Sequence, residues 1–413
     1  MIRPAALLLC IATTTAPVAT QAQSAADQFQ PRRGLNFDIW VRWMDVRDMI
    51  ATPGFLDNYP DWRAHVTADA INALPVQGYD FARLPMDPAP LLALGPGVGQ
   101  DALIAQIAAT AALVQASGMK VIIDMHSFPR PDEDWGVESI LSDPALFAAY
   151  TALIGKIASS LTGMDPTRTA LELMNEPTND CDAIWGDAAP EWPAQQIALY
   201  TEARRLAPDL PLVLTGACWG GPEGLAALTP LPDDNLLYSF HSYTPFLFTH
   251  QGADWTTGLE TVLHHLPYPP TMLTGQIASD LARDTAQYAA AERLQTDPPA
   301  TQANLNRALA DYRASADGDV AKAAQIAAAW ADQHNIPRNR LLLGEFGARR
   351  TAEDTEADKA SRARFLCAKS LSASALGIGW AVWSWSGNFA VADDTPNRRP
   401  DRQICAALGL PCQ

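Results

Sequence analysis

The sequence has few basic residues and no long apolar run. Among its 413 residues, 29 are Lys or Arg and 46 are Asp or Glu, which gives a formal net charge of −17. Such an acidic surface disfavours binding to nucleic acid and to anionic membranes. No apolar run reaches the ~20 residues that a membrane-spanning helix requires. We therefore expect no nucleic-acid partner and no membrane anchor.

Several motifs that mark common enzyme classes are also absent. There is no G-x-S-x-G segment, which argues against a serine hydrolase with a nucleophile elbow. No glycine-rich phosphate-binding fingerprint follows the first expected strand, which disfavours a doubly wound nucleotide-binding sheet. No C-x-x-C or Cys/His spacing indicates a zinc site. We find no internal repeat, no linker and no second domain.

The first 22 residues have the pattern of an export signal. Arg3 supplies the positive charge, residues 5–12 form a short apolar stretch, and small residues precede a cleavage site after Ala22. Lipid attachment at Cys10 is disfavoured because bulky Leu9 stands where a small residue is expected. We expect residues 1–22 to be a signal peptide and the mature protein, residues 23–413, to be secreted or periplasmic.

Apolar strand-like segments alternate with alanine-rich helical segments along the mature chain. Segments such as KVIIDMH (120–126) and LPLVLTG (210–216) are continuously apolar, as is typical of strands buried on both faces of a parallel sheet. The expected strands are 34–40, 79–85, 120–126, 169–176, 210–217, 235–243, 340–348 and 377–385. The expected helices are 65–74, 101–117, 144–161, 193–206, 317–334 and 356–375. Eight such repeats predict a single α/β domain, a (β/α)8 TIM barrel, with an open doubly wound sheet as the alternative.

One segment departs from this alternation. About seventy residues, 244–316, separate the sixth strand from the next expected helix. This segment contains the proline-rich stretch LPYPP (266–270) and an Ala- and Gln-rich stretch with helical character. Because structureless loops of this length are uncommon in a compact domain, we expect an inserted subdomain or lid.

The carboxyl ends of the expected strands carry polar and aromatic residues, and active sites of such barrels lie at that end. The fourth strand runs through LELMNEPTND (171–180), where Pro177 stops the strand and leaves Glu176 at its tip. The seventh strand ends at Glu345. Two carboxylates facing a cleft are what glycoside hydrolysis needs, one to protonate the leaving oxygen and one to attack the anomeric carbon or activate water.

Other interpretations of these residues are open. Glu345 is also explained by a buried ion pair with Arg83, although the same guanidinium would keep Glu345 ionised and nucleophilic. A metal site could use Asp124, His126, Glu176 and His241, but the first strand has no His-x-His pair. We therefore predict neither a metal nor a cofactor. A non-catalytic carbohydrate-binding barrel is the non-enzyme alternative.

The strand ends together resemble glycoside hydrolase family 5, the cellulase-type retaining hydrolases. The most specific segments are LMNEP (173–177) and LGEFG (343–347), supported by RLP (83–85), DMH (124–126) and HSY (241–243). The resemblance implies that Glu176 is the acid/base and Glu345 the nucleophile. It implies substrate-binding roles for Arg83, His126, Asn175, His241, Tyr243 and Trp383. Arg83 and Tyr243 would hydrogen-bond the nucleophile, Asn175 would hold the sugar 2-hydroxyl, and Trp383 would be the stacking platform.

The resemblance implies a polysaccharide or oligosaccharide substrate. We expect cleavage of a β-linked glucan, as in an endo-β-1,4-glucanase, with a β-mannanase or a β-1,3-glucan-active enzyme as alternatives. The oligomeric state is left open.

Five cysteines remain after signal removal, so one thiol is expected to be unpaired. Cys181 and Cys218 follow neighbouring strands of the barrel, which favours a disulfide between their loops. Cys405 and Cys412 pair with each other, or one of them pairs with Cys367.

Overall fold

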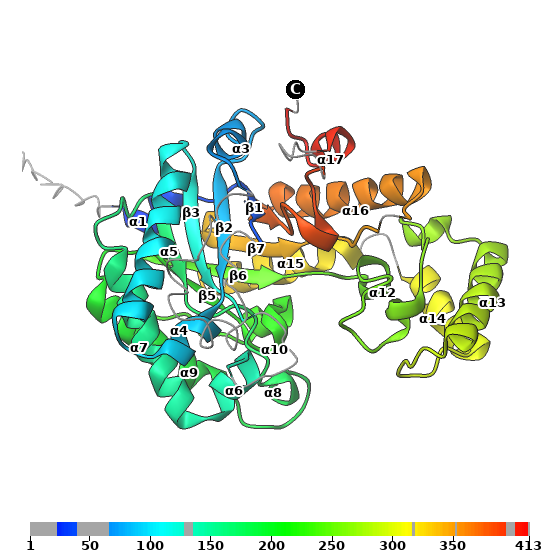
Figure 1. Ribbon diagram of the computed structural model, residues 1–413, viewed down its shortest axis with the longest axis horizontal. Helices are drawn as coiled ribbons and strands as arrows, with labels where there is room; N and C mark the ends of the chain where they lie inside the picture. The colour runs from blue at the N-terminus through cyan, green and yellow to red at the C-terminus, as the bar shows by residue number, and fades with distance from the viewer. Residues whose placement is uncertain are drawn as a thin grey trace, which may run out of the picture.

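The computed structural model describes residues 23–38, 66–127, 135–315, 319–351, 353–393 and 401–411. Eight parallel strands form a closed barrel in sequence order (Figure 1). They are β1 (Arg33–Asn36), β2 (Phe81–Met86), β3 (Lys120–Met125), β4 (Thr169–Glu172), β5 (Leu212–Thr215), β6 (Leu236–His241), β7 (Leu341–Phe346) and β8 (Gly379–Val382). Each predicted strand overlaps an observed one, so the (β/α)8 prediction is confirmed. The predicted signal peptide, residues 1–22, lies outside the described residues.

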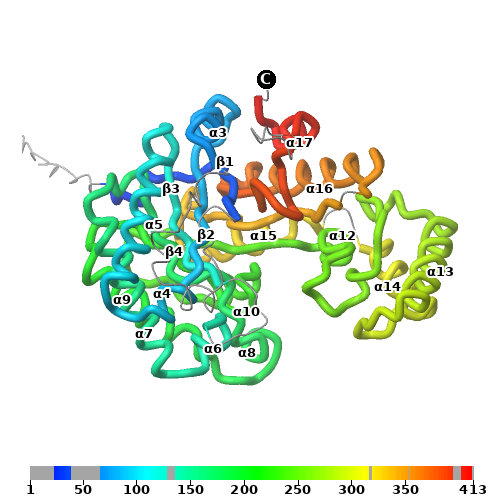
Figure 2. The backbone as a smooth tube through the Cα atoms, in the orientation of Figure 1, coloured from blue at the N-terminus to red at the C-terminus, as the bar shows by residue number. Residues whose placement is uncertain are grey.

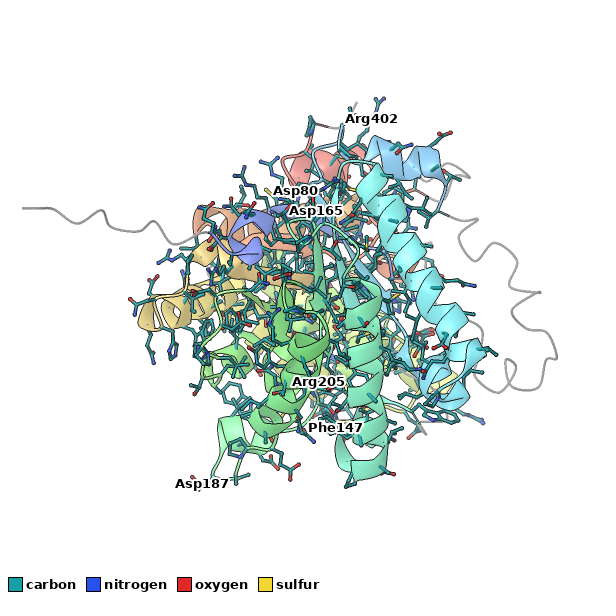
Figure 3. The ribbon with its side chains drawn as sticks, turned by 90° about the vertical axis from the view of Figure 1, so that its left-hand side faces the viewer. Asp80, Phe147, Asp165, Asp187, Arg205 and Arg402 are labelled. Atoms are coloured by element: carbon teal, nitrogen blue, oxygen red, sulfur yellow. A yellow bond between two sulfur atoms is a disulfide. The ribbon has the colours of Figure 1, made fainter. Side chains whose placement is uncertain are left out.

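The helices surround the barrel, as the tube in Figure 2 shows. Those between strands are α3 (Ala68–Ala73), α4 (Pro88–Leu94), α5 (Val98–Ala116), α6 (Val137–Ser142), α7 (Pro144–Ser160), α8 (Cys181–Trp185), α9 (Trp192–Leu206), α10 (Ala217–Gly220), α11 (Pro222–Ala226), α15 (Asp319–Gln333) and α16 (Glu356–Ala375), with the 3-10 turn η3 (Arg338–Arg340) before β7. η4 (Gly387–Phe389) and α17 (Arg402–Ala407) follow β8. Viewed from the side, these helices present charged side chains such as Arg205 to solvent (Figure 3).

Local sequence signals fix where the long helices begin. Asp143 accepts hydrogen bonds from the first amides of α7, and Pro144 occupies the first turn, where its missing N–H costs nothing. Thr355 and Asp358 form a reciprocal capping box at the start of α16. The predicted boundaries of α16 therefore agree with the observed ones.

The barrel interior is filled by one inward-facing apolar residue from most strands. At its amino end, Ala26 and Phe29 of α1 (Ala25–Phe29) join this cluster and close the barrel. Gly34 is required in β1 because a Cβ there would overlap the ring of Phe81. With this end plugged, the carboxyl end is left for a site.

The segment between β6 and α15 is folded. It contains α12 (Phe246–Thr249), η1 (Leu259–Val262), η2 (Pro270–Met272), α13 (Gly275–Glu292) and α14 (Gln302–Ala314). Helices α13 and α14 pack against each other and project from the barrel beyond the end of β6 (Figure 1). Tyr312 of α14 is buried and donates a hydrogen bond to the carbonyl of Pro267 at 2.6 Å. The helical character predicted for this segment is present, and its role as a lid stays a prediction.

A disulfide joins Cys181 to Cys218 with an S–S distance of 2.01 Å, which confirms the predicted link between the loops after β4 and β5. Cys405 is also disulfide-bonded, and Cys367 is a free thiol. A disulfide of Cys367 with either Cys405 or Cys412, the predicted alternative, is therefore wrong, and Cys412 itself lies outside the described residues. Within the described ranges, no helix has the length and apolar character needed to cross a bilayer.

Candidate active site

The predicted site residues come together at the carboxyl end of the barrel. Arg83, His241 and Glu345 lie on β2, β6 and β7, whereas the others follow strands. These are His126 after β3, Asn175 and Glu176 after β4, Tyr243 after β6 and Trp383 after β8. The pairing register shifts between Phe240 and His241 and again between Leu343 and Phe346. Irregular pairing of this kind is common next to active sites, where it redirects side chains.

Arg83 is the centre of the polar network. Its side chain is fully buried. The guanidinium donates to Glu172 Oε2 (2.7 Å), Asn36 Oδ1 (3.0 Å), Glu345 Oε1 (2.7 Å) and Asn175 Oδ1 (2.8 Å), and Nη2 lies 3.0 Å from Asp124 Oδ2. Burial alone would lower the pKa of Arg83, because it disfavours the charged form. The attraction of the neighbouring carboxylates is larger and holds the pKa of Arg83 well above its usual value. A permanent positive charge therefore lies beneath the cleft.

Glu345 receives one hydrogen bond on each carboxylate oxygen. Arg83 Nη1 donates to Oε1, and the hydroxyl of Tyr243 donates to Oε2 at 2.9 Å. The side chain is almost fully buried. Hydrogen bonds to both oxygens fix the orientation of the carboxylate.

The chain leaves β4 earlier than the sequence predicts. The strand ends at Glu172, so the prediction of a strand to Glu176 is wrong for the last four residues. The amide of Asn175 still donates to the carbonyl of Met125 at 2.8 Å, which keeps this segment beside β3. Glu176 then adopts a left-handed backbone conformation with φ 39°. This conformation is uncommon for a residue other than glycine, and such residues concentrate at functional sites.

Glu176 lies opposite Glu345 and is the more exposed of the two side chains. Its Oε1 is 2.7 Å from His241 Nδ1, and a quarter of the side-chain surface remains exposed to the cleft. Burial of the carboxyl group raises the pKa of Glu176 to about 7. One carboxylate oxygen of Glu176 lies within 4.8 Å of one of Glu345. The two carboxyl groups thus face each other across the carboxyl end of the barrel.

His126 and Trp383 form one wall of the site. Their rings stack with centroids 5.2 Å apart and an interplanar angle of 16°. His126 Nδ1 lies 2.9 Å from Asp124 Oδ2, and Nε2 lies 3.5 Å from Asn175 Nδ2. Burial lowers the pKa of His126 to about 4, so the imidazole is neutral at pH 7. Trp383 is half-buried and keeps part of its indole accessible, whereas Trp385 is buried in the core.

Two residues of the network were missed by the sequence analysis. Glu172 accepts from Arg83 and from Thr215 Oγ1 at 2.9 Å. Although burial opposes ionisation, the Arg83 charge lowers the pKa of Glu172. Asn36 connects Arg83 to the carbonyl of Gly344, to which its Nδ2 donates at 3.0 Å. The available signal was a carboxylate in the otherwise apolar strand TALEL, because an unpaired buried charge is prohibitively costly.

Two groups of potential metal ligands occur among the described residues, Asp124–His126–Glu345 and Glu176–His241–Glu345. They differ from the predicted alternative, because each includes Glu345. The guanidinium of Arg83 contacts both Glu345 and Asp124 and already supplies a compensating positive charge. The Asp124–His126–Glu345 group is therefore explained by the ion pairs around Arg83.

A closed (β/α)8 barrel with two facing glutamates at its carboxyl end has the arrangement used by the glycoside-hydrolase class of barrels. Residues 45–389 match the family model described as Cellulase (glycosyl hydrolase family 5). The chain belongs to glycosyl hydrolase family 5.

Comparisons with individual proteins agree with this assignment. The chain is 26% identical over 282 residues to Endoglucanase 3 of Fibrobacter succinogenes, covering 67% of this chain and 38% of the relative. It is 26% identical over 225 residues to Cellodextrinase A of Ruminococcus flavefaciens, covering 54% of this chain and 62% of that protein. These matches thus span less than two thirds of either relative.

Solved structures share the fold at low sequence identity. A mutant form of Thermotoga maritima Cel5A in complex with cellobiose superimposes with a TM-score of 0.64 at 19% identity, covering 93% of this chain and 99% of that chain. A Bacteroides ovatus GH5 xyloglucanase in complex with a XXXG heptasaccharide superimposes with a TM-score of 0.62 at 15% identity. This match covers 94% of this chain and 77% of that chain.

Proposed function

We propose that this protein is a retaining glycoside hydrolase that cleaves β-linked glucan, most specifically an endo-β-1,4-glucanase. The observation that carries the proposal is the approach of Glu176 and Glu345 oxygens to within 4.8 Å. Retaining enzymes hold their carboxyl groups ~5–5.5 Å apart, whereas inverting enzymes need ~6.5–9.5 Å to admit a water molecule. Because 4.8 Å is a limit on the nearest pair of oxygens, the carboxyl groups themselves are somewhat farther apart, which agrees with the retaining separation and supports double displacement.

The environments of the two glutamates support an assignment of roles. Glu345 would be the nucleophile, because Arg83 and Tyr243 hydrogen-bond its two oxygens. Glu176 would be the acid/base, because a pKa of about 7 lets it begin the reaction protonated and end it ionised.

In the first step, a Glu345 oxygen would bond to the anomeric carbon while the glycosidic C–O bond breaks. Glu176 would give its proton to the leaving oxygen. In the second step, Glu176 would take a proton from water as that water attacks the anomeric carbon and releases Glu345. Asn175 would bind the 2-hydroxyl of the sugar, His126 and His241 would line the same subsite, and Trp383 would stack on its ring.

The choice of a β-1,4-glucan is supported by the relatives named endoglucanase and cellodextrinase. A second candidate is a β-mannanase, because Thermotoga maritima Cel5A, which shares this fold, has been solved in complex with mannotriose as well as cellobiose. Activity on β-1,3-glucan is a further alternative. We also propose export to the periplasm or medium through residues 1–22, and a lid role for residues 244–316.

The test is reducing-end release by the purified mature protein from β-1,4-glucan, mixed-linkage glucan, mannan and β-1,3-glucan. Proton NMR of the first-formed product reports the anomeric configuration. Activity with retained β-configuration, absent in Glu345→Gln, supports the proposal. Initial formation of the α-anomer would disprove double displacement. If no polymer is cleaved but calorimetry detects sugar binding, the protein is a carbohydrate-binding barrel and the proposal of hydrolysis is rejected.

A further inference from the structure

The folded segment after β6 brings a cluster of aromatic rings up to Tyr243. The ring of His250 lies edge-on to Tyr243 at 5.1 Å and stacks on Phe246 at 3.9 Å with an angle of 16°. Phe389, from the loop after β8, contacts both Tyr243 (5.9 Å) and Trp255 (6.1 Å). Tyr243 itself donates to Glu345. The cluster is therefore continuous with the proposed cleavage site.

The outer rings of this cluster are exposed. The exposed fractions are 48% for Phe246 and 45% for Trp255, although His250 and Phe389 beneath them are buried. Large aromatic side chains usually bury most of their surface. Two exposed rings that contact the same His250, Phe246 stacked on it and Trp255 edge-on at 6.2 Å, therefore call for an explanation. An indole offers an apolar face together with an N–H donor, which suits a ligand that is apolar on one side and polar at its rim.

The rings are also held rigidly. Thr249 Oγ1 donates to the carbonyl of Tyr243 at 2.7 Å. The same Thr249 oxygen lies 3.0 Å from His250 Nδ1. The guanidinium of Arg349 lies over the ring of Trp255 at 5.7 Å, and the amide of Arg349 donates to the carbonyl of Thr249 at 2.8 Å. A surface fixed before binding loses little entropy when a ligand arrives.

We propose that Phe246 and Trp255 form a sugar-binding platform, here called the insertion platform, that stacks on pyranose rings of the glucan chain beyond the cleavage point. This inference rests on the proposed function. Its occupant is a sugar chain because the platform continues from Tyr243 at the cleavage site, so a polymer threaded past Glu345 meets it. The C–H face of a pyranose would lie on the indole, and its hydroxyls would face Arg349 and water.

The test compares kcat/KM for cello-oligosaccharides of increasing length and for polymer. For Trp255→Ala we expect about a tenfold loss on long substrates, the size of one aromatic contact of ~1.4 kcal/mol, and no loss on the shortest cleaved oligosaccharide. Phe246→Ala should show the same length dependence, and Trp255→Phe should restore most of the activity. Tyr288→Ala is the matched control, because Tyr288 is an exposed aromatic (51%) on α13. This helix belongs to the same segment but lies apart from α12, which carries Phe246 (Figure 1).

Other outcomes would overturn the inference. Equal losses on short and long substrates would show that Trp255 acts through Tyr243, and unchanged kinetics would show that no sugar binds there. If wild type cleaves none of these substrates, the proposed function fails. Calorimetric binding of long oligosaccharides to wild type and Trp255→Ala then tests the platform without turnover, and equal affinities would reject it.

Discussion

Arg83 Nη1 donates a hydrogen bond to Glu345 Oε1 across 2.7 Å, between two side chains that lie 262 positions apart in the chain. The same guanidinium contacts Glu172 and Asp124 inside the barrel. Glu345 is therefore held by a group that is itself fixed on several sides. Orientation of this kind is what a nucleophile requires, since small misplacements of reacting atoms cost large factors in rate.

Glu345→Gln should lower kcat by at least about 1,000-fold, because an amide cannot form the covalent intermediate. Glu345→Gly supplemented with azide should regain turnover and release a glycosyl azide, identified by mass spectrometry. Glu353→Gln, at an exposed glutamate, is the control and should match wild type. Full activity of Glu345→Gln would remove this residue from the mechanism.

Activity should fall as pH rises through about 7, because Glu176 must be protonated to begin the reaction and its pKa is raised to about 7 by burial. Above that pH, kcat/KM should drop about tenfold per unit. Glu176→Gln should abolish this dependence and should lose activity on oligosaccharides. It should still react with dinitrophenyl glycosides, whose leaving group needs no proton. Equal losses on both substrate types would contradict the acid role.

Arg83→Met should lower the free energy of unfolding by about 3–5 kcal/mol at pH 7, since it leaves buried carboxylates without their counter-charge. Denaturant titrations measure this change. The loss should be smaller at pH 4, where protonation can neutralise part of the unpaired charge. In the double variant Arg83→Met, Glu172→Gln, part of the stability should return, because one orphaned charge is removed as well. Strictly additive effects would argue against direct coupling of this pair.

The barrel could be predicted because its signal is local. Continuously apolar strands such as 120–126 and the capping residues of α16 specify their elements without reference to the rest of the chain. The disulfide was predictable once the barrel made Cys181 and Cys218 neighbours. The parts of the site at strand ends followed from the same geometry.

The rest depended on interactions that single segments do not reveal. Arg83 meets Asn36 and Glu172 across 47 and 89 positions, and no local pattern indicates which buried polar groups will pair. A residue before proline is expected to be extended, whereas Glu176 is left-handed. The chain around Glu176 is fixed by contacts with other strands. Thr215 Oγ1 donates to Glu172, Arg83 donates to Asn175, and the amide of Asn175 donates to the carbonyl of Met125.

The double variant Cys181→Ala, Cys218→Ala should be less stable by about 2–4 kcal/mol, because the disulfide closes a loop of 37 positions and restricts the unfolded chain. The midpoint of denaturant unfolding measures this. Cys367→Ala, which removes the free thiol, is the matched control and should change the midpoint less. An unchanged midpoint in the double variant would show that the β4 and β5 loops need no covalent link.

Lys369 of α16 is buried, and its Nζ donates to Ser242 Oγ at 2.6 Å, beside Tyr243. Burial lowers the pKa of Lys369 from 10.5 to about 7. Between these two values the unfolded chain holds the proton and the folded chain does not, so stability should rise with pH across this window. Below about 7 the folded protein must carry a buried ammonium group.

Lys369→Met should therefore be more stable than wild type at pH 6, by up to about 4 kcal/mol, less the lost hydrogen bond to Ser242. The advantage should shrink steadily as pH rises from about 7 toward 10.5, because the wild-type amine becomes neutral in both states only above the higher value. Unfolding free energies measured from pH 6 to 10 test this, with Lys322→Met at an exposed position as the control. A difference between Lys369→Met and wild type that is independent of pH would mean that the buried amine does not titrate on unfolding, and its role would then be limited to holding Ser242.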